Sequence, residues 1–146
     1  MICTIDASVF VAAARETEAH YAISRMFLQQ VRAHAVPVVC PTLALPECAA
    51  AIARPTHDSV LASELVSLVE SFVGLQLAAL ELSLARRAAE IATEHRLRGA
   101  DSVYVAVAES FNATLVTWDT EMLQRAPAVV PTITPAEWME KQNGDS

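Results

Sequence analysis

The chain has few of the residues that common phosphate-binding and phosphate-transfer sites require. It contains three glycines, and no two of them are close enough to form a glycine-rich loop around a nucleotide phosphate. Lysine occurs once, at Lys141 beyond the last predicted strand, whereas a phosphoacceptor aspartate needs a nearby lysine to hold its phosphoryl group. These shortages argue against nucleotide binding and against phosphoryl transfer.

Membrane spans, targeting signals and paired cysteines are also missing from the sequence. No uninterrupted apolar run approaches the roughly 18 residues of a membrane helix, and the N-terminus enters an apolar strand without a signal peptide. The three cysteines have no CxxC spacing, so we expect buried, reduced thiols, with Cys3 and Cys40 in contact across adjacent strands. The sequence therefore predicts a cytoplasmic protein that does not engage a membrane.

Size and charge predict one compact domain without a broad nucleic-acid-binding surface. A chain of 146 residues, 53% of them hydrophobic, is enough for one α/β domain with a substantial core. The formal net charge of −7 argues against general binding of nucleic acid. All but one of the 10 basic residues are arginine, which suits bidentate phosphate contacts. Any nucleic acid should therefore be held locally, by a few arginines around an acidic centre.

Short apolar runs alternate with longer helical segments, which is typical of a parallel α/β sheet. We expect strands at residues 2–5, 36–40, 75–80, 114–117 and 129–133. We expect helices at residues 9–14, 23–31, 48–54, 58–72, 81–97, 102–111, 121–124 and 135–140. Pro55 should stop the third helix, and Gly99 should cap the fifth. The domain should cover residues 1–141, followed by a disordered tail over residues 142–146.

Apolar patterns in these helices predict how they pack. The second helix should bury the stripe Ile23, Met26, Phe27 and Val31, and the fifth should bury Leu82, Ala85, Ala89 and Ala92. The segment 102–111 is apolar all round and should be buried on both sides. The helix over 58–72 carries a wider apolar arc than one core contact uses. We expect part of it to be buried in a homodimer or against another partner, the alternative being a helix enclosed within its own core.

Four acidic residues stand at junctions between predicted strands and helices or in early helical turns: Asp6, Glu47, Asp101 and Asp119. Each alone is explained as a helix cap or as a first-turn acid that favours the helix dipole. The set is explained less well, because the carboxyl ends of parallel strands share one edge of the sheet, where ligands bind. Carboxylates that converge there and cannot neutralise one another predict a site for divalent metal.

Hydroxyl groups accompany two of the four acids. Ser8 lies two residues after Asp6 and Thr117 lies two residues before Asp119, where each could orient a carboxylate or a metal-bound water. Hard oxygen ligands of this kind suit Mg²⁺ or Mn²⁺. The four histidines are dispersed, and no pair of histidines or cysteines has zinc-type spacing. We therefore expect magnesium or manganese rather than zinc.

Four short motifs carry these residues: Asp6-Ala7-Ser8 after the first strand, Pro46-Glu47, Arg98-Gly99-Ala100-Asp101-Ser102, and Val116-Thr117-Trp118-Asp119. Together they resemble the PIN-domain nucleases, and among these the VapC-type ribonuclease toxins of bacterial toxin–antitoxin pairs. The resemblance covers nearly the whole chain, and every acidic position of the family pattern is occupied. It implies a three-layer Rossmann-like α/β fold with a central, mostly parallel sheet flanked by helices. It also implies Mg²⁺- or Mn²⁺-dependent RNA cleavage, an antitoxin partner and frequent dimerisation.

The implied chemistry suggests roles for the acids. Phosphodiester cleavage needs an activated water in line with the leaving oxygen and a group that absorbs charge on the phosphate, and metal ions supply both. Asp6 and Asp101 are the expected central ligands, and Glu47 and Asp119 complete the shell directly or through water. One and two catalytic metals are both compatible with the sequence. The main alternative is a non-catalytic PIN-type module that binds a protein or RNA partner.

Overall fold

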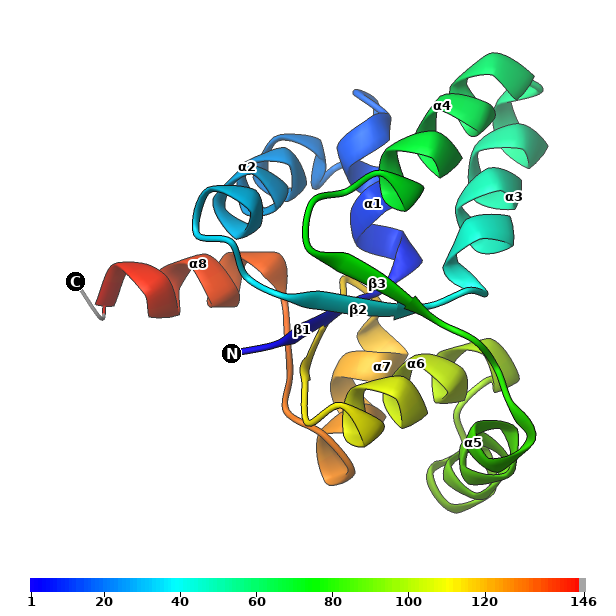
Figure 1. The fold of residues 1–146 in the computed structure, drawn as a ribbon. Coiled ribbons are helices and arrows are strands. Elements are labelled where there is room, and N and C mark those ends of the chain that lie inside the picture. Colours follow the sequence, from blue (N-terminus) through cyan, green and yellow to red (C-terminus); the bar gives the residue numbers. More distant parts are fainter. Residues whose placement is uncertain (145–146) are drawn as a thin grey trace.

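A five-stranded sheet forms the centre of the computed structural model, which describes residues 1–144 (Figure 1). The strands are β1 (Cys3–Ile5), β2 (Val38–Pro41), β3 (Leu75–Ala78), β4 (Thr114–Val116) and β5 (Thr132–Ile133), in the order β3-β2-β1-β4-β5. Each neighbouring pair is parallel. The predicted parallel sheet is confirmed, and within residues 1–144 it is wholly rather than mostly parallel. β1 and β2 are buried along their full length, as expected for strands covered on both faces.

Helices cover both faces of this sheet and make the fold three-layered. Figure 1 shows α1 to α4 on one face and α5, α6 and α7 on the other. Their bounds are α1 (Ala7–Ala14), α2 (Tyr21–Ala33), α3 (Ala44–Thr56), α4 (Ser59–Glu70), α5 (Leu82–His95), α6 (Gly99–Ser110) and α7 (Thr120–Arg125). The last helix, α8 (Pro135–Gly144), packs against α2. The predicted three-layer arrangement is thus confirmed.

The path of the chain through the sheet determines where a ligand-binding crevice can open. From β1 the chain builds outward through β2 to β3, and then crosses back to β4 and β5 on the other side of β1. The segment after β1 therefore leads to the face that carries α1, whereas the segment after β4 leads to α7 on the opposite face. In open parallel sheets ligands bind at the carboxyl edge where the strand order reverses in this way. In this chain that position follows Ile5 and Val116.

The helix α6 lies in the interior, between the sheet and α5. Every residue from Asp101 to Ala108 is buried, as the apolar pattern of this segment predicts. A helix that is apolar on all sides is stable only where both of its faces are covered. This burial holds the first turn of α6, and with it Asp101, against the sheet.

The predicted end of α3 is wrong by two residues. The helix continues past Pro55 to Thr56, although proline cannot donate a backbone hydrogen bond. A final turn forms because the His57 backbone N–H donates to the Ala53 carbonyl at 2.8 Å. One lost hydrogen bond in the last turn of a helix is tolerated when the next donor finds a partner.

The predicted cap of α5 is also wrong. The helix ends at His95, and Arg96 takes the left-handed backbone conformation at φ 53° that the prediction assigned to glycine. Gly99 instead begins α6. The buried Leu97 anchors the short connection between the two helices, so packing rather than glycine places the turn.

Two predicted inward faces are displaced. In α2, Phe27 and Val31 are buried and Ile23 is half-buried, as predicted, but Met26 is 52% exposed and Ser24 and Leu28 are buried instead. In α5, Leu82 is 65% exposed, whereas Ala88 and Ile91 are buried. Alanine costs little on either face of a helix, so an alanine-rich pattern does not determine which face turns inward.

The C-terminal region is more helical than predicted. A short 3₁₀ helix, η1 (Ala126–Ala128), precedes β5, which is therefore shorter than expected. α8 continues to Gly144, so residues 142–144 of the predicted tail are helical, while residues 145–146 lie outside the described residues. The Phe27 and Trp138 rings pack edge to face, with their centroids 5.2 Å apart, and hold α8 against α2.

The three cysteines are free and buried, as expected. Cys3 on β1 is in register with Val38 of the neighbouring β2, so Cys40 lies two residues further along that strand. Within residues 1–144 no helix combines the length and apolar character that crossing a membrane requires.

Candidate active site at the carboxyl edge of the sheet

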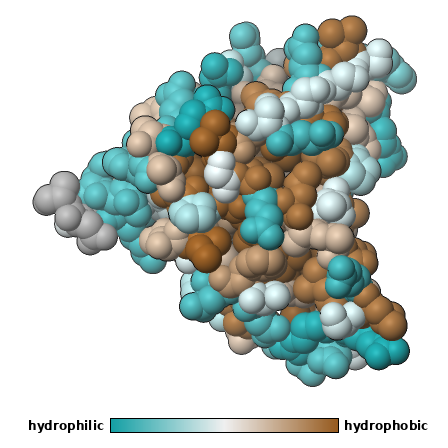
Figure 2. Space-filling view, in the orientation of Figure 1, coloured by the Kyte–Doolittle hydropathy of each residue, from teal (hydrophilic) through white to brown (hydrophobic). Residues whose placement is uncertain are grey.

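The four predicted acids come together at the carboxyl edge of the sheet. Asp6 directly follows β1, Glu47 lies in the first turn of α3, and Asp101 lies in the first turn of α6. These three line one cleft of about 310 Å³. Asp119 follows β4 and joins the group through Arg98, which also lines the cleft. On the side where the strands end, Figure 2 shows the outline of the molecule indented between the α3–α4 pair and α5.

Helix capping explains only one of these positions. The Asp119 Oδ1 accepts a hydrogen bond from the Met122 backbone N–H at 2.9 Å and so caps α7. Asp6 stands at the N-cap position of α1 but makes no capping hydrogen bond with its side chain. Glu47 and Asp101 are inside their helices rather than at the caps. The capping alternative is therefore confirmed for Asp119 and wrong for Asp6 and Asp101.

Asp6 is 6% exposed and is oriented by a relay of hydrogen bonds. Thr117 Oγ1 donates to Asp6 Oδ2 at 2.8 Å, and Ser8 Oγ lies 3.4 Å from Thr117 Oγ1. Either hydroxyl can be the donor in this contact. The Trp118 backbone N–H in turn donates to Ser8 Oγ at 3.2 Å. Ser8 thus lies beside Asp6, as the sequence predicts, whereas the Thr117 hydroxyl orients Asp6 rather than the carboxylate of Asp119.

The surroundings oppose the charge on two of the acids. Burial raises the pKa of Asp6, although the hydrogen-bonding groups of Ser8 and Thr117 favour its charged form. Burial also raises the pKa of Asp101, against the opposing effect of Arg98. The charge of Asp119 adds to both increases. A site that holds several buried carboxyls in this way gains from any added cation.

Arg98 bridges two of the acids and is a site residue that the acidic pattern alone does not single out. Its Nε donates to Asp101 Oδ2 at 2.7 Å, and its Nη2 donates to Asp119 Oδ2 at 2.6 Å. The side chain is 60% exposed, so the guanidinium meets these acids from the solvent side. The sequence does carry a signal for this contact, because Arg98 precedes Asp101 by about one helical turn.

Glu47 contains a buried oxygen without a partner. Its Oε1 and the hydroxyl of Tyr104 are both buried, and neither has a hydrogen-bond partner within residues 1–144. Burial raises the pKa of Glu47; the nearby Tyr104 hydroxyl opposes this rise, and the Asp6 and Asp101 carboxyls add to it. Burial likewise raises the pKa of Tyr104 above its usual range. An unsatisfied carboxylate oxygen in such a place is costly unless a cation or a donor reaches it.

The donors around the cleft fit a hard divalent cation. The residues that line it include carboxylates and a serine hydroxyl but no histidine or cysteine, which is the ligand chemistry of Mg²⁺ and Mn²⁺. The unpartnered Oε1 of Glu47 adds a free ligand atom. Within residues 1–144 no three acidic, histidine or cysteine side chains are close enough to form a ready metal site. Arg98 holds the Oδ2 atoms of Asp101 and Asp119 in this arrangement, so it would share these two acids with any bound metal.

The fold and this cleft together define a class: three-layer α/β proteins with a parallel sheet and buried carboxyls where the strand order reverses. Comparison of the sequence with protein families is more specific. The PIN domain family matches residues 3–129, and the chain belongs to this family. No curated protein matches the chain.

Several solved structures share the fold, among them VapC-type toxins. VapBC2 from Rickettsia felis, bound to a DNA fragment from its promoter, superposes with a TM-score of 0.71 at 15% identity, over 92% of this chain and 98% of that chain. VapC20 from Mycobacterium tuberculosis, a sarcin-ricin loop cleaving toxin, superposes with a TM-score of 0.70 at 16% identity, over 84% of this chain and 93% of that chain. PAE2754 from Pyrobaculum aerophilum superposes with a TM-score of 0.71 at 22% identity, over 99% of this chain and 90% of that chain. At these identities the likeness concerns the fold.

Proposed function

We propose that this protein is a metal-dependent endoribonuclease and the toxin of a type II toxin–antitoxin pair. The observation that carries the proposal is the meeting of Asp6, Glu47 and Asp101 in one cleft, with Asp119 linked to them through Arg98. The ion pairs within residues 1–144 leave Asp6 and Glu47 without a cationic partner, which a divalent metal would supply. Membership of the PIN family and the fold shared with VapC20 support this reading.

Each acid has a part in the proposed reaction. Asp6 and Asp101 would hold Mg²⁺ or Mn²⁺, and Glu47 and Asp119 would complete its shell directly or through water. A bound divalent ion supplies an activated water and absorbs charge on the phosphate. Thr117 keeps the Asp6 carboxylate in one orientation. Burial together with the nearby acids keeps the pKa of the Tyr104 hydroxyl above its usual range, so it stays protonated and available as a donor to Glu47.

Arg98 changes partners between the resting and the working site in this proposal. In the resting site its guanidinium neutralises Asp101 and Asp119. With these carboxylates engaged by a metal, the exposed guanidinium would be free to hold a phosphate oxygen of the RNA. Arginine suits that task because its planar fork forms two parallel hydrogen bonds to phosphate.

An antitoxin is the proposed protein partner. The fold shared with the VapBC2 complex supports such a partner. An arginine inserted by the antitoxin would compete with Arg98 for Asp101 and Asp119, and would block metal and phosphate together. An amphipathic partner helix over exposed apolar surface would provide most of the affinity.

A cleavage assay tests the proposed activity. Freshly purified protein should cut single-stranded RNA in Mg²⁺ or Mn²⁺, lose this activity in EDTA, and regain it with excess metal. The rival function, a PIN-type module that only binds, predicts RNA or protein binding without cleavage in either metal. Intact RNA under all metal conditions, from protein that still binds it, would establish that rival.

We also propose a homodimer that buries the outer side of α4. Leu65 and Val69 are buried in the protein's own core, which the enclosed-helix alternative explains, but Val60 and Leu68 are 67% and 43% exposed. Exposed apolar side chains on one helix are a common feature of subunit interfaces.

Light scattering should give twice the chain mass of 15.7 kDa for the wild type, and Val60→Glu should shift it toward the monomer. A buried glutamate without a partner is expected to weaken the interface by more than about tenfold. Ser83→Glu, at an exposed position of α5, adds the same charge elsewhere and should leave the dimer intact. A wild type that stays monomeric at high concentration would contradict the proposal.

A further inference from the structure

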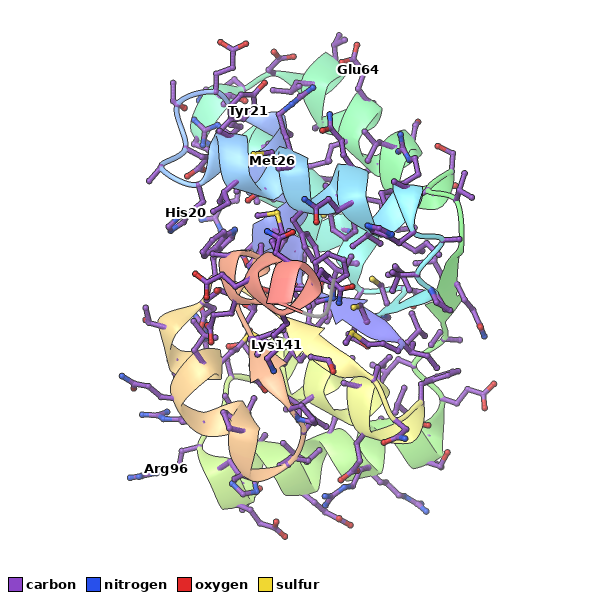
Figure 3. The ribbon with its side chains drawn as sticks, turned by 90° about the vertical axis from the view of Figure 1, so that its left-hand side faces the viewer. His20, Tyr21, Met26, Glu64, Arg96 and Lys141 are labelled. Atoms are coloured by element: carbon purple, nitrogen blue, oxygen red, sulfur yellow. The ribbon has the colours of Figure 1, made fainter. Side chains whose placement is uncertain are left out.

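Two aromatic rings stack on each other next to residues of the site: His20, which precedes α2, and Trp118, which follows Thr117 and packs partly against the core. The His20 and Trp118 rings lie 3.8 Å apart and are parallel to within 6°. His20 is exposed and Trp118 is half-buried. Figure 3 shows His20 at the margin of the molecule, where α2 begins. His20 occupies the N-cap position of α2 but makes no capping hydrogen bond with its side chain, so capping does not explain its placement.

The Trp118 ring is fixed in position before any ligand arrives. Its Nε1 donates to Ser24 Oγ at 2.8 Å, and Ser24 is fully buried in α2. Its backbone N–H donates to Ser8 Oγ, which belongs to the relay that orients Asp6. A ligand that stacks here would lose little binding energy to ordering of the site, because hydrogen bonds already hold both the indole N–H and the backbone N–H of Trp118.

The platform, defined as the stacked His20 and Trp118 rings, adjoins the acids through the chain itself. Trp118 stands between Thr117, which donates to Asp6, and Asp119, which pairs with Arg98. Successive Cα atoms are about 3.8 Å apart, so the backbone of Trp118 lies one residue from both contacts. The platform is therefore carried by the same short segment that orients Asp6 and pairs with Arg98.

We propose that this platform stacks an unpaired nucleobase of the RNA substrate, next to the phosphate that is cut. Flat rings that stack on bases are the usual device by which proteins hold single-stranded RNA. The device also suits this chain, because a net charge of −7 leaves little general attraction for the phosphate backbone. The inference rests on the proposed function for the identity of the ligand as RNA, and it adds where a base is held.

Binding of a labelled ten-nucleotide single-stranded RNA, measured in EDTA so that no cleavage occurs, tests the platform. His20→Ala should weaken binding roughly 5- to 100-fold, which corresponds to the loss of one stacked base. His20→Phe keeps a stacking ring and should retain most of the affinity. His34→Ala, an exposed histidine at the other end of α2, is the matched control and should bind as the wild type does.

Two further readouts separate stacking from mere shielding of the indole. RNA should quench the fluorescence of Trp118, while the fully buried Trp138 should be unaffected. In a series of RNAs that each lack one base, the RNA that lacks the stacked base should bind the wild type and His20→Ala with equal affinity. If His20→Ala binds RNA as the wild type does, or if the wild type does not bind it, the platform has no such role. Affinity that depends on His20, without cleavage in Mg²⁺, would instead uphold the platform and overturn the proposed activity.

Discussion

Replacing Asp101 with asparagine is expected to lower the rate of metal-dependent RNA cleavage by roughly 10³-fold or more, with no loss of fold. Asp101 is 8% exposed in the first turn of α6, where it lines the cleft together with Asp6 and Glu47. Asparagine keeps its shape and can still accept the hydrogen bond from Arg98 through the amide oxygen. It lacks the charge that holds a hard divalent cation. The lost rate would therefore report on charge rather than on packing.

Asp58 provides a matched control, since Asp58→Asn makes the same exchange outside the cleft. Its side chain accepts a hydrogen bond from the Leu61 backbone N–H at 2.9 Å and caps α4. Asparagine caps helices about as well as aspartate, so this variant should keep both stability and cleavage rate. Circular dichroism and thermal unfolding should match the wild type closely for Asp58→Asn and remain cooperative for Asp101→Asn. Cleavage by Asp101→Asn at the wild-type rate would remove Asp101 from the mechanism.

Replacing Asp6 with asparagine is expected to stabilise the metal-free protein at neutral pH while it abolishes cleavage. Asp6 is buried, and this burial raises its pKa, so its charged form destabilises the fold at neutral pH. Asparagine removes the charge and can keep the hydrogen bond from Thr117 through its amide oxygen. In a domain of about this size, each 1 kcal/mol of added stability raises Tm by roughly 2–4 °C. A variant that loses function and gains stability is the expected signature of a functional buried charge.

The same cause determines how the stability of the metal-free protein depends on pH. The pKa values of Asp6 and Asp101 are raised above their ordinary value of 3.8, so between these values the folded state binds more protons than the unfolded state. Their destabilising effect is absent below the ordinary value and grows as the pH rises through the raised values. Glu109 acts in the opposite direction, because its hydrogen bonds with Arg87 lower its pKa. The stability difference between Asp6→Asn and the wild type isolates the contribution of Asp6 to the pH dependence. This difference should shrink toward acidic pH.

Thermal unfolding in EDTA over about pH 4 to 8 measures this difference. Mg²⁺ should raise the Tm of the wild type, because a ligand that binds only the folded state stabilises it, and should raise that of Asp6→Asn much less. Asp58→Asn should follow the wild type in both series. An Asp6→Asn protein less stable than the wild type at every pH would show that the Asp6 charge stabilises the fold.

Much of the architecture follows from local patterns in the chain. The apolar runs at residues 2–5 and 36–40 predict strands covered on both faces, and β1 and β2 are such strands. The segment 102–111, apolar on every side, predicts the buried helix α6. Parallel strands end at one edge of their sheet, so acids that follow strands or begin the next helices must approach one another. Strand periodicity and connectivity are local properties, which is why they can be read before the fold is known.

Other features depend on which groups meet in space. The inward face of α5 depends on where α6 lies, because its alanines are acceptable on any side. The pairing of Arg98 with both Asp101 and Asp119 requires α6 and the end of β4 to come together. The stack of His20 on Trp118 likewise joins segments that are distant in the chain. The burial of the Glu47 oxygen without a partner also results from how distant segments pack around it. Desolvation, ion pairing and ring stacking are short-range effects, so only tertiary packing decides which residues experience them.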